Sequence, residues 1–398
     1  MERHIGTVSR GIRCPIIREG DDLAAIVAES VLAAARAEQI AFHDRDIICV
    51  TESVVARAQG NYASVDDIGQ EVKEQLGGDT IGVIFPILSR NRFAICLKGI
   101  ARGAKKVVLM LSYPADEVGN QLVTWDMIDA AGIDPYTDVL TLDDFRRHFG
   151  VYKHPFTGMD YVAYYKELIE KEGAEAEILF ANRPEAILGY TKRVLHCDIH
   201  SRFRTARLLQ KAGAEKAISL TDLLSTKTEA HGYNPQYGLL GSNKATETTV
   251  KLFPRDCTAF AQSIADRMKA ATGKNLEAMV YGDGAFQDPV GQIWELADPV
   301  VSPGYTKGLE GTPNELKLKY LADNDFGDLK GEALQHAIEA RIREKTADSL
   351  VGQMASQGTT PRRLTDLIGS LCDLTSGSGD KGTPVVFIQG YFDNYTNE

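Results

Sequence analysis

The alternation of apolar and polar positions predicts short buried strands separated by amphipathic helices. Compact apolar runs bounded by turn residues predict strands at residues 46–50, 278–281 and 385–388. Apolar residues recur at helical spacing from Leu23, directly after the N-cap candidate Asp22, and again across residues 257–271. We therefore expect an α/β protein with mixed sheets.

Residues 81–113 contain three apolar runs, each of which predicts a strand. Arg90 and Arg92 stand in a turn between two of these runs, where their guanidinium groups would suit bidentate binding of a carboxylate or phosphate. Exposed arginines in a hairpin turn need no ligand. A plain surface role is therefore slightly favoured for both.

Residues 113–233 are expected to form an inserted α/β region, and they contain an unusual polar series. His196, Asp198 and His200 alternate with apolar residues, and Arg202 and Arg204 continue the series. On a strand these side chains would share one face, which could hold a metal or an anionic substrate. A solvated sheet face gives the same pattern and is the favoured alternative.

Composition limits the function classes. The chain has 398 residues, 43% of them hydrophobic and 25% charged, and a net charge of −11. No apolar run approaches the roughly 20 residues of a membrane span, and the start of the chain lacks a signal pattern, so a cytoplasmic protein without a membrane partner is expected. The acidic balance and the lack of a basic tail disfavour nucleic acid as a partner. Six widely spaced cysteines without a Cys-x-x-Cys pair predict reduced, buried thiols.

Two glycine-containing loops carry the candidate chemistry. The predicted strand at residues 278–281 breaks into an acidic loop, and its carboxylates are Asp283, Asp288, Glu295 and Asp298. One or two carboxylates suffice for Mg²⁺ or Mn²⁺ that completes its shell with water and phosphate oxygens. An ordinary turn has about equal weight.

The second loop precedes residues 385–388, and its glycines would let backbone N–H groups approach phosphates, although it is not a P-loop.

Several segments together resemble the coenzyme F-420-0:L-glutamate ligase family, which are nucleotide-dependent gamma-glutamyl ligases. Besides the Asp283 loop, they are GIRCPIIREGDDL (11–23), DIICVTESVVARAQG (46–60), GLLGSN (238–243) and GSGDKGTPVVFIQG (377–390). The resemblance implies a gamma-glutamyl ligase-like α/β fold, a homodimer, and GTP with a divalent metal. Residues 1–112 and 234–398 would then be the two parts of the ligase-like domain, on either side of the insertion at 113–233.

The resemblance also implies site residues. The nucleotide contacts carried over are Gly11, Glu52, Ser53, Arg57, Asn243, Gly377, Gly379, Asp380, Lys381 and Gly382. Asp283 would bind metal, and either Asp288, Glu295 or Asp380 would replace the missing ligands or the metal site is reduced. Three positions depart from the metal-binding pattern of the family, namely Leu240 for an aspartate, Gly284 for a hydroxyl residue and Ser378 for an acid. Arg57 stands in place of a lysine.

The expected function is a Mg²⁺- or Mn²⁺-dependent amide ligase that uses GTP or ATP to add L-glutamate, or another amino acid, to a small carboxylated acceptor through an acyl phosphate. F-420 and a folate-like acceptor are both consistent with the residues, and the number of residues added stays open. His196, Asp198, His200, Arg202 and Arg204 are the candidates for acceptor recognition. Two alternatives are a nucleotide- or metabolite-binding protein of the same fold without ligase activity, and a metal-dependent hydrolase centred on His196 and His200.

Overall fold

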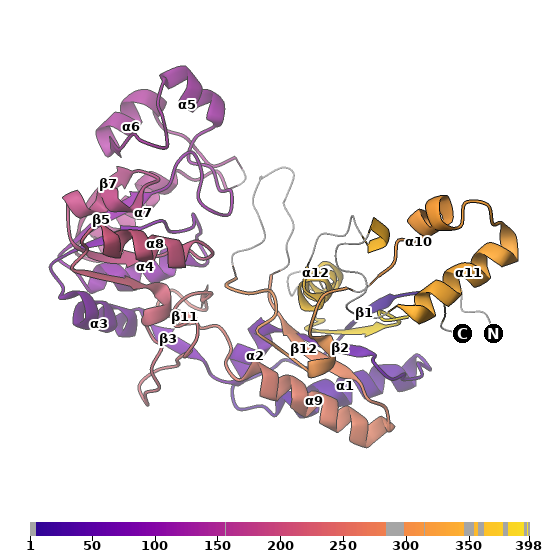
Figure 1. Cartoon of the computed structure of the whole chain (residues 1–398). Helices are drawn as coiled ribbons and strands as arrows, with labels where there is room; N and C mark the ends of the chain where they lie inside the picture. Colours follow the sequence, from indigo (N-terminus) through magenta and orange to yellow (C-terminus); the bar gives the residue numbers. More distant parts are fainter. Residues whose placement is uncertain are drawn as a thin grey trace.

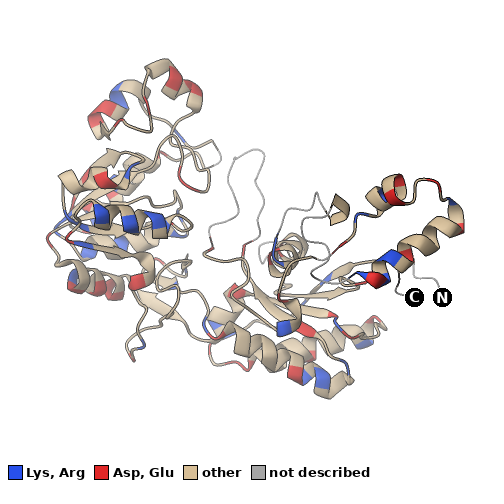
Figure 2. Ribbon diagram, in the orientation of Figure 1, with Lys and Arg blue, Asp and Glu red and all other residues tan. Residues whose placement is uncertain are grey.

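The chain folds into two lobes, shown in Figure 1. The computed structural model describes residues 5–155, 157–283, 298–313, 315–345, 354–356, 362–376, 381–393 and 396. Acidic and basic residues are interspersed on both lobes (Figure 2). None of the described helices combines the length and the apolar character that crossing a membrane requires. All six cysteines are free, and five of them are buried, as the sequence predicted.

The first lobe, which we call the core lobe, is built on a five-stranded sheet. Its strand order is β1 (Val8–Ile12), β14 (Val385–Gln389), β2 (Ile47–Thr51), β12 (Glu277–Tyr281) and β13 (Gly304–Tyr305). The neighbours β2 and β12 are parallel, and the other pairs are antiparallel. The sheet therefore joins the two ends of the chain, and the three predicted strands β2, β12 and β14 are confirmed.

Helices cover both faces of this sheet, which explains why its central strands are apolar throughout. α1 (Leu23–Ala37) and α9 (Cys257–Thr272) pack on one face, and α12 (Leu364–Ser376) packs on the other. The side chain of Asp22 caps α1 by accepting a hydrogen bond from the backbone N–H of Ala25. The predicted helices at residues 23–31 and 257–271 are thus confirmed.

The second lobe is built on a six-stranded sheet. Its strand order is β6 (Leu140–Thr141), β7 (Glu175–Phe180), β5 (Lys106–Leu111), β4 (Thr80–Ile84), β8 (Arg193–His196) and β9 (Lys216–Ser219). All pairs except β6 with β7 are parallel. α3 (Val65–Leu76), α4 (Phe93–Arg102) and α7 (Tyr161–Lys171) cover one face, and α8 (Arg202–Lys211) covers the other. The mixed α/β architecture of the chain agrees with the expected fold class.

Smaller elements complete the described chain. A three-stranded sheet, β10 (Asn243–Lys244), β11 (Thr249–Lys251) and β3 (Tyr62–Ser64), lies between the lobes (Figure 1). The remaining α-helices are α2 (Glu52–Ala58), α5 (Trp125–Ala131), α6 (Leu142–Phe149), α10 (Leu318–Tyr320) and α11 (Gly331–Glu344). A π-helical turn (Leu321–Asp325) follows α10, and 3-10 turns include Pro184–Gly189, Leu220–Asp222, Lys307–Leu309 and Met354–Ser356.

Two features differ from the sequence-based expectation. The six-stranded sheet starts at Thr80, well before the expected boundary at residue 113. Of the three strands predicted in residues 81–113, the middle one is wrong because it is helix α4. Eight of the ten residues of α4 are buried. Five consecutive apolar residues, Phe93–Leu97, begin α4, and a run of this length is equally typical of a buried strand.

Helices α3 and α4 approach closely at Gly99, which generates a test of the packing. A Cβ atom at Gly99 would lie 2.6 Å from the Cβ of Ile68 and 2.9 Å from the carbonyl oxygen of Val65. We expect Gly99→Ala to lower the free energy of unfolding by about 1–3 kcal/mol, because the two helices must separate. Urea unfolding would measure the change.

Gly189→Ala is the matched control, since a Cβ atom there meets nothing within 4 Å. Its free energy of unfolding should stay within about 0.5 kcal/mol of the wild-type value. Equal effects of the two substitutions would show that the helices are not tightly packed at Gly99.

Candidate active site

A cavity of about 620 Å³ lies where the core lobe meets the second lobe. The core lobe lines it with residues 14–17 after β1, 51–54 and 57 at the end of β2, 281–283 after β12, 373 and 376 of α12, and 382–384 before β14. The remaining lining residues are Asn91, Arg92 and Asn243. The cavity therefore collects segments that are far apart in the sequence.

The topology of the core sheet explains why these segments converge. β2 and β12 are parallel neighbours, so their carboxyl ends lie at the same edge. β14 runs antiparallel to β2, so its beginning lies at that edge too, and the backbone N–H of Thr51 donates to the carbonyl of Pro384 at 3.0 Å. Ligand-binding loops in open sheets are found at such edges.

The structure brings together most of the described residues that the resemblance pointed to. Those that line the cavity are Glu52, Ser53, Arg57, Asn243, Asp283 and Gly382. Gly11 lies on β1, where an added Cβ would meet the side chain of Thr383 at 3.0 Å, and it does not line the cavity. Lys381 is described but is not among the lining residues. Gly377, Gly379, Asp380 and Asp288 lie outside the described residues.

Arg92 forms the central ion pair of the site. One guanidinium nitrogen, Nη1, donates to Asp298 Oδ1 at 2.6 Å, and the other, Nη2, donates to Asp283 Oδ2. Asp298 also accepts a hydrogen bond from the backbone N–H of Asp283 at 2.7 Å. Because Arg92 precedes α4 and both aspartates belong to the core lobe, this cluster connects the two lobes.

Burial and mutual repulsion shape the charges around Arg92. Burial raises the pKa of Glu52 to about 7; Lys251 and Arg92 oppose the shift, and Asp298 adds to it. Burial, followed by the charge of Asp298, raises the pKa of Asp283 to about 7 against the influence of Arg92. Burial alone would lower the pKa of Arg92, but its aspartate partners raise it above the ordinary value. The cluster holds more acidic than basic groups and would attract a cation.

A second basic group reaches the same region from β11. Lys251 Nζ donates to the Ser53 hydroxyl and, at 3.4 Å, to the Ser53 carbonyl. These bonds place an ammonium group beside the first turn of α2, where backbone N–H groups point outward. Glu52 and Ser53 begin that turn. The segment therefore combines features that suit an anionic ligand.

The residues present also fit a hard divalent cation. Among the described residues no three His, Cys, Asp or Glu side chains are arranged to hold a metal ion. Mg²⁺ needs only one or two protein carboxylates when water and phosphate complete its shell. Asp283 and Asp373 both line the cavity, and Glu52 Oε2 is buried without a hydrogen-bond partner in the described structure. Asp283 is the carboxylate best placed to hold such an ion beside a bound phosphate.

The strand predicted to carry His196, Asp198 and His200 on one face is wrong, whereas acceptor recognition by these residues stays a prediction. Strand β8 ends at His196. Asp198 and His200 lie in the loop that follows it, and Arg202 and Arg204 belong to helix α8. Asp198 accepts hydrogen bonds from the hydroxyls of Ser201 at 2.8 Å and Thr205 at 2.7 Å, and it pairs with His196 at 3.1 Å.

These bonds hold the chain as it turns from β8 into α8, so the side chains of the series do not share a strand face. His196 and Asp198 are buried and serve this turn. The shared strand face that suggested a metal site at His196 and His200 is therefore not formed.

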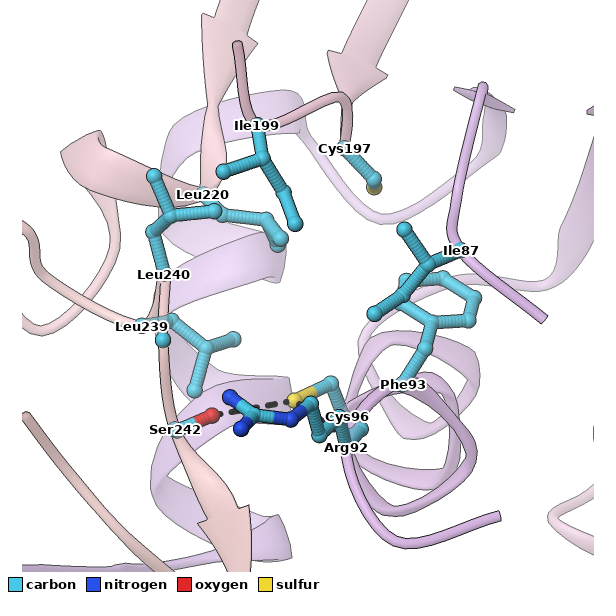
Figure 3. Close-up of a pocket in the computed structure, with 11 residues that line it drawn as sticks. Ile87, Arg92, Phe93, Cys96, Cys197, Ile199, Leu220, Leu239, Leu240 and Ser242 are labelled. Carbon is cyan, nitrogen blue, oxygen red and sulfur yellow. Dashed lines mark hydrogen bonds between the residues drawn. The ribbon is translucent and has the colours of Figure 1, made fainter. Parts of the chain in front are cut away.

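Leu240, at the position where the resemblance implies an aspartate, packs into the apolar core of the second lobe. It lines a small cavity together with Ile87, Ile199 and Leu239, as Figure 3 shows, and is 2% exposed. This cavity lies at the carboxyl ends of β4, β8 and β9. An aspartate at this position would be surrounded by apolar side chains, so a leucine suits the local packing.

Sequence reasoning missed several members of the site. It noted Arg92 but favoured a surface role, because a predicted hairpin would expose it. Lys251 lies in a three-residue strand and Asp373 on an ordinary amphipathic helix, so neither carries a local signal. Asp298 was noted only as one of several loop carboxylates. Arg92, Asp298 and Asp373 are identified by their position around one cavity or one ion pair, and Lys251 is identified by its hydrogen bonds to Ser53.

The raised pKa of Glu52 predicts a pH-dependent stability. The folded state holds the Glu52 proton more tightly than the unfolded state, so stability falls as pH rises from 4.5 to about 7. Glu52→Gln removes this loss. Relative to wild type, the variant should gain up to about 3 kcal/mol of unfolding free energy between pH 4.5 and pH 8. Denaturant unfolding of both proteins at pH 4.5 and pH 8 measures this difference. An unfolding free energy that changes with pH by the same amount in both proteins would contradict the raised pKa of Glu52.

Comparison with known proteins agrees with this arrangement. The family model described as F420-0:Gamma-glutamyl ligase matches residues 11–390, a range that includes both lobes and the expected insertion. A search of curated proteins gave no match. Since the match spans nearly the whole chain and the cavity gathers segments from both of its ends, the chain belongs to the F420-0:gamma-glutamyl ligase family.

Proposed function

We propose that the chain is a nucleotide- and divalent-metal-dependent ligase that joins L-glutamate, or another amino acid, to a small carboxylated acceptor. The observation that carries the proposal is the cavity itself. Its walls combine the carboxylates of Asp283 and Asp373, the basic groups of Arg57 and Arg92, and backbone turns at one sheet edge. These are the groups that phosphoryl transfer to a carboxylate requires. The chain also belongs to a family that is defined by glutamyl ligation.

The proposed reaction has two steps. An acceptor carboxylate oxygen attacks the γ-phosphorus of GTP or ATP, the bond from that phosphorus to the β–γ bridging oxygen breaks, and nucleoside diphosphate leaves. The amino nitrogen of glutamate then attacks the acyl carbon, the carbon–oxygen bond to phosphate breaks, and the nitrogen loses its proton. The products are an amide, nucleoside diphosphate and phosphate.

Each part of the cavity has a role in this scheme. Glu52, Ser53, Arg57 and Asn243, with the turn at Gly382, would hold the nucleotide. Lys251 would support Ser53 and add positive charge near the phosphates. Asp283 would hold Mg²⁺ or Mn²⁺, which when bound neutralises phosphate charge. The two lobes together would keep water from the acyl phosphate.

The family makes an F-420-type compound the first acceptor to test, and a folate-like compound remains a second. Acceptor recognition would come from the second lobe, which contributes Asn91 and Arg92 to the cavity wall. A homodimer is part of the proposal because the resemblance implies it. Binding without ligation is the alternative function, favoured by the buried Leu240 at an expected ligand position.

The test is a coupled assay of nucleotide cleavage and product mass. Purified protein is incubated with GTP or ATP, Mg²⁺ or Mn²⁺, L-glutamate and either an F-420-type acceptor or a small-molecule extract. We expect cleavage that depends on glutamate and an acceptor that gains glutamyl mass. Asp283→Asn should lower the rate by about 100-fold or more, because it removes charge stabilisation at the phosphates.

Asp143→Asn is the matched control, since Asp143 is exposed on α6 and remote from the cavity lining. It should leave the rate unchanged. Nucleotide binding without cleavage, for every amino acid supplied, would reject the ligase and support the binding protein. Cleavage that ignores both glutamate and Asp283→Asn would reject the proposed site.

A further inference from the structure

The two halves of the Arg92 guanidinium have unequal partners. Asp298, bound to Nη1, has a side chain only 2% exposed and does not line the large cavity. Asp283, bound to Nη2, has a side chain 34% exposed and lines that cavity. The first contact is therefore sheltered by protein, whereas the second is open to ligands.

Arg92 also occupies a special place between the lobes. Of the residues described here, it alone lines both the large cavity and the small apolar cavity of the second lobe. Figure 3 shows its side chain at one end of the small cavity, beside Ser242 and Cys96. Its backbone N–H donates to the Ser89 hydroxyl at 3.1 Å at the start of α4. Arg92 is thus anchored at its backbone and at Nη1, while Nη2 faces the site.

We propose that Arg92 is a substrate-binding residue whose Nη2 group leaves Asp283 when a divalent cation binds there, and then binds the carboxylate of the acceptor. The assignment of the anion as the acceptor rests on the proposed function. The exchange follows from electrostatics at this contact: Arg92 Nη2 holds Asp283 Oδ2, and a cation bound to the same carboxylate would repel the guanidinium and weaken its attraction to Asp283. Asp298 keeps the guanidinium in place throughout.

This exchange gives the site an order of binding. With Asp283, Asp298 and Glu52 close together, an incoming carboxylate meets negative charge and an occupied arginine. A cation on Asp283 both reduces that charge and frees a donor. Because binding free energies are linked, the effect is reciprocal: the bound anion must raise the affinity for the cation by the same factor as the bound cation raises the affinity for the anion.

The first measurement uses Mn²⁺ alone, with free Mn²⁺ followed by electron paramagnetic resonance in the absence of nucleotide. Arg92→Met removes the competing guanidinium, so Mn²⁺ should bind about tenfold more tightly than in wild type. Arg90→Met is the matched control, because Arg90 is exposed in the same loop and lines neither cavity. Its Mn²⁺ affinity should equal that of wild type.

The second measurement uses trifluoroacetate as a carboxylate probe, followed by ¹⁹F NMR with and without saturating Mg²⁺. In wild type and Arg90→Met, Mg²⁺ should strengthen probe binding severalfold. Arg92→Met should lose this response. Arg92→Lys keeps the positive charge but has one ammonium in place of a fork, so it should fold and still lose most of the response.

Two results would overturn the exchange: unchanged Mn²⁺ affinity in Arg92→Met, or equal responses of the Arg90 and Arg92 variants. Thermal unfolding of each variant shows whether a lost Mg²⁺ response merely reflects misfolding. If Arg92→Met is misfolded, the Mg²⁺ response of Arg92→Lys decides whether Arg92 takes part in the exchange. Failure of the proposed function has a different signature. The Mn²⁺ and trifluoroacetate responses would be as described, while no amide would form.

Discussion

The structure depends on one buried ion pair, in which Arg92 of the second lobe holds Asp298 and Asp283 of the core lobe. Removing these charges from water is costly, and the cost is offset only when both partners and their hydrogen bonds are in place. Asp298 meets that condition through Arg92 and the backbone N–H of Asp283. This contact joins the second lobe to the core lobe at the wall of the cavity.

The two sheets present the same kind of edge to this ion pair. The large cavity lies at the carboxyl ends of β2 and β12, and the small cavity lies at the carboxyl ends of β4, β8 and β9. Loops at such edges are free to bind because the strands behind them are already fully hydrogen-bonded. Arg92 stands where the two edges meet. The core lobe thus supplies most of the cavity wall, and the second lobe adds Asn91 and Arg92.

The charges at the site favour an exchange of partners at Arg92 over a fixed set of ion pairs. Glu52 and Asp283 both have a pKa of about 7, because burial penalises their charged forms and Asp298 adds repulsion. A single guanidinium cannot neutralise all three carboxylates. Further positive charge is therefore favourable in the cavity, which is the reason for including a divalent cation in the proposed function.

The sequence by itself determined the strands β2, β12 and β14, helices α1 and α9, the reduced cysteines and the resemblance to the family, because each rests on local periodicity or on contiguous motifs. It did not determine helix α4 or the end of β8. The short apolar run that begins α4 has a pattern that a buried strand shares, and the alternation of His196, Asp198 and His200 does not record that β8 ends at His196. Only the tertiary structure decided that Glu52 and Asp283 lie with Arg92, Lys251, Asp298 and Asp373. These charges are paired across roughly two hundred residues of sequence. Such pairing depends on the order of strands in the sheet and on the docking of the two lobes, and no local sequence pattern records either.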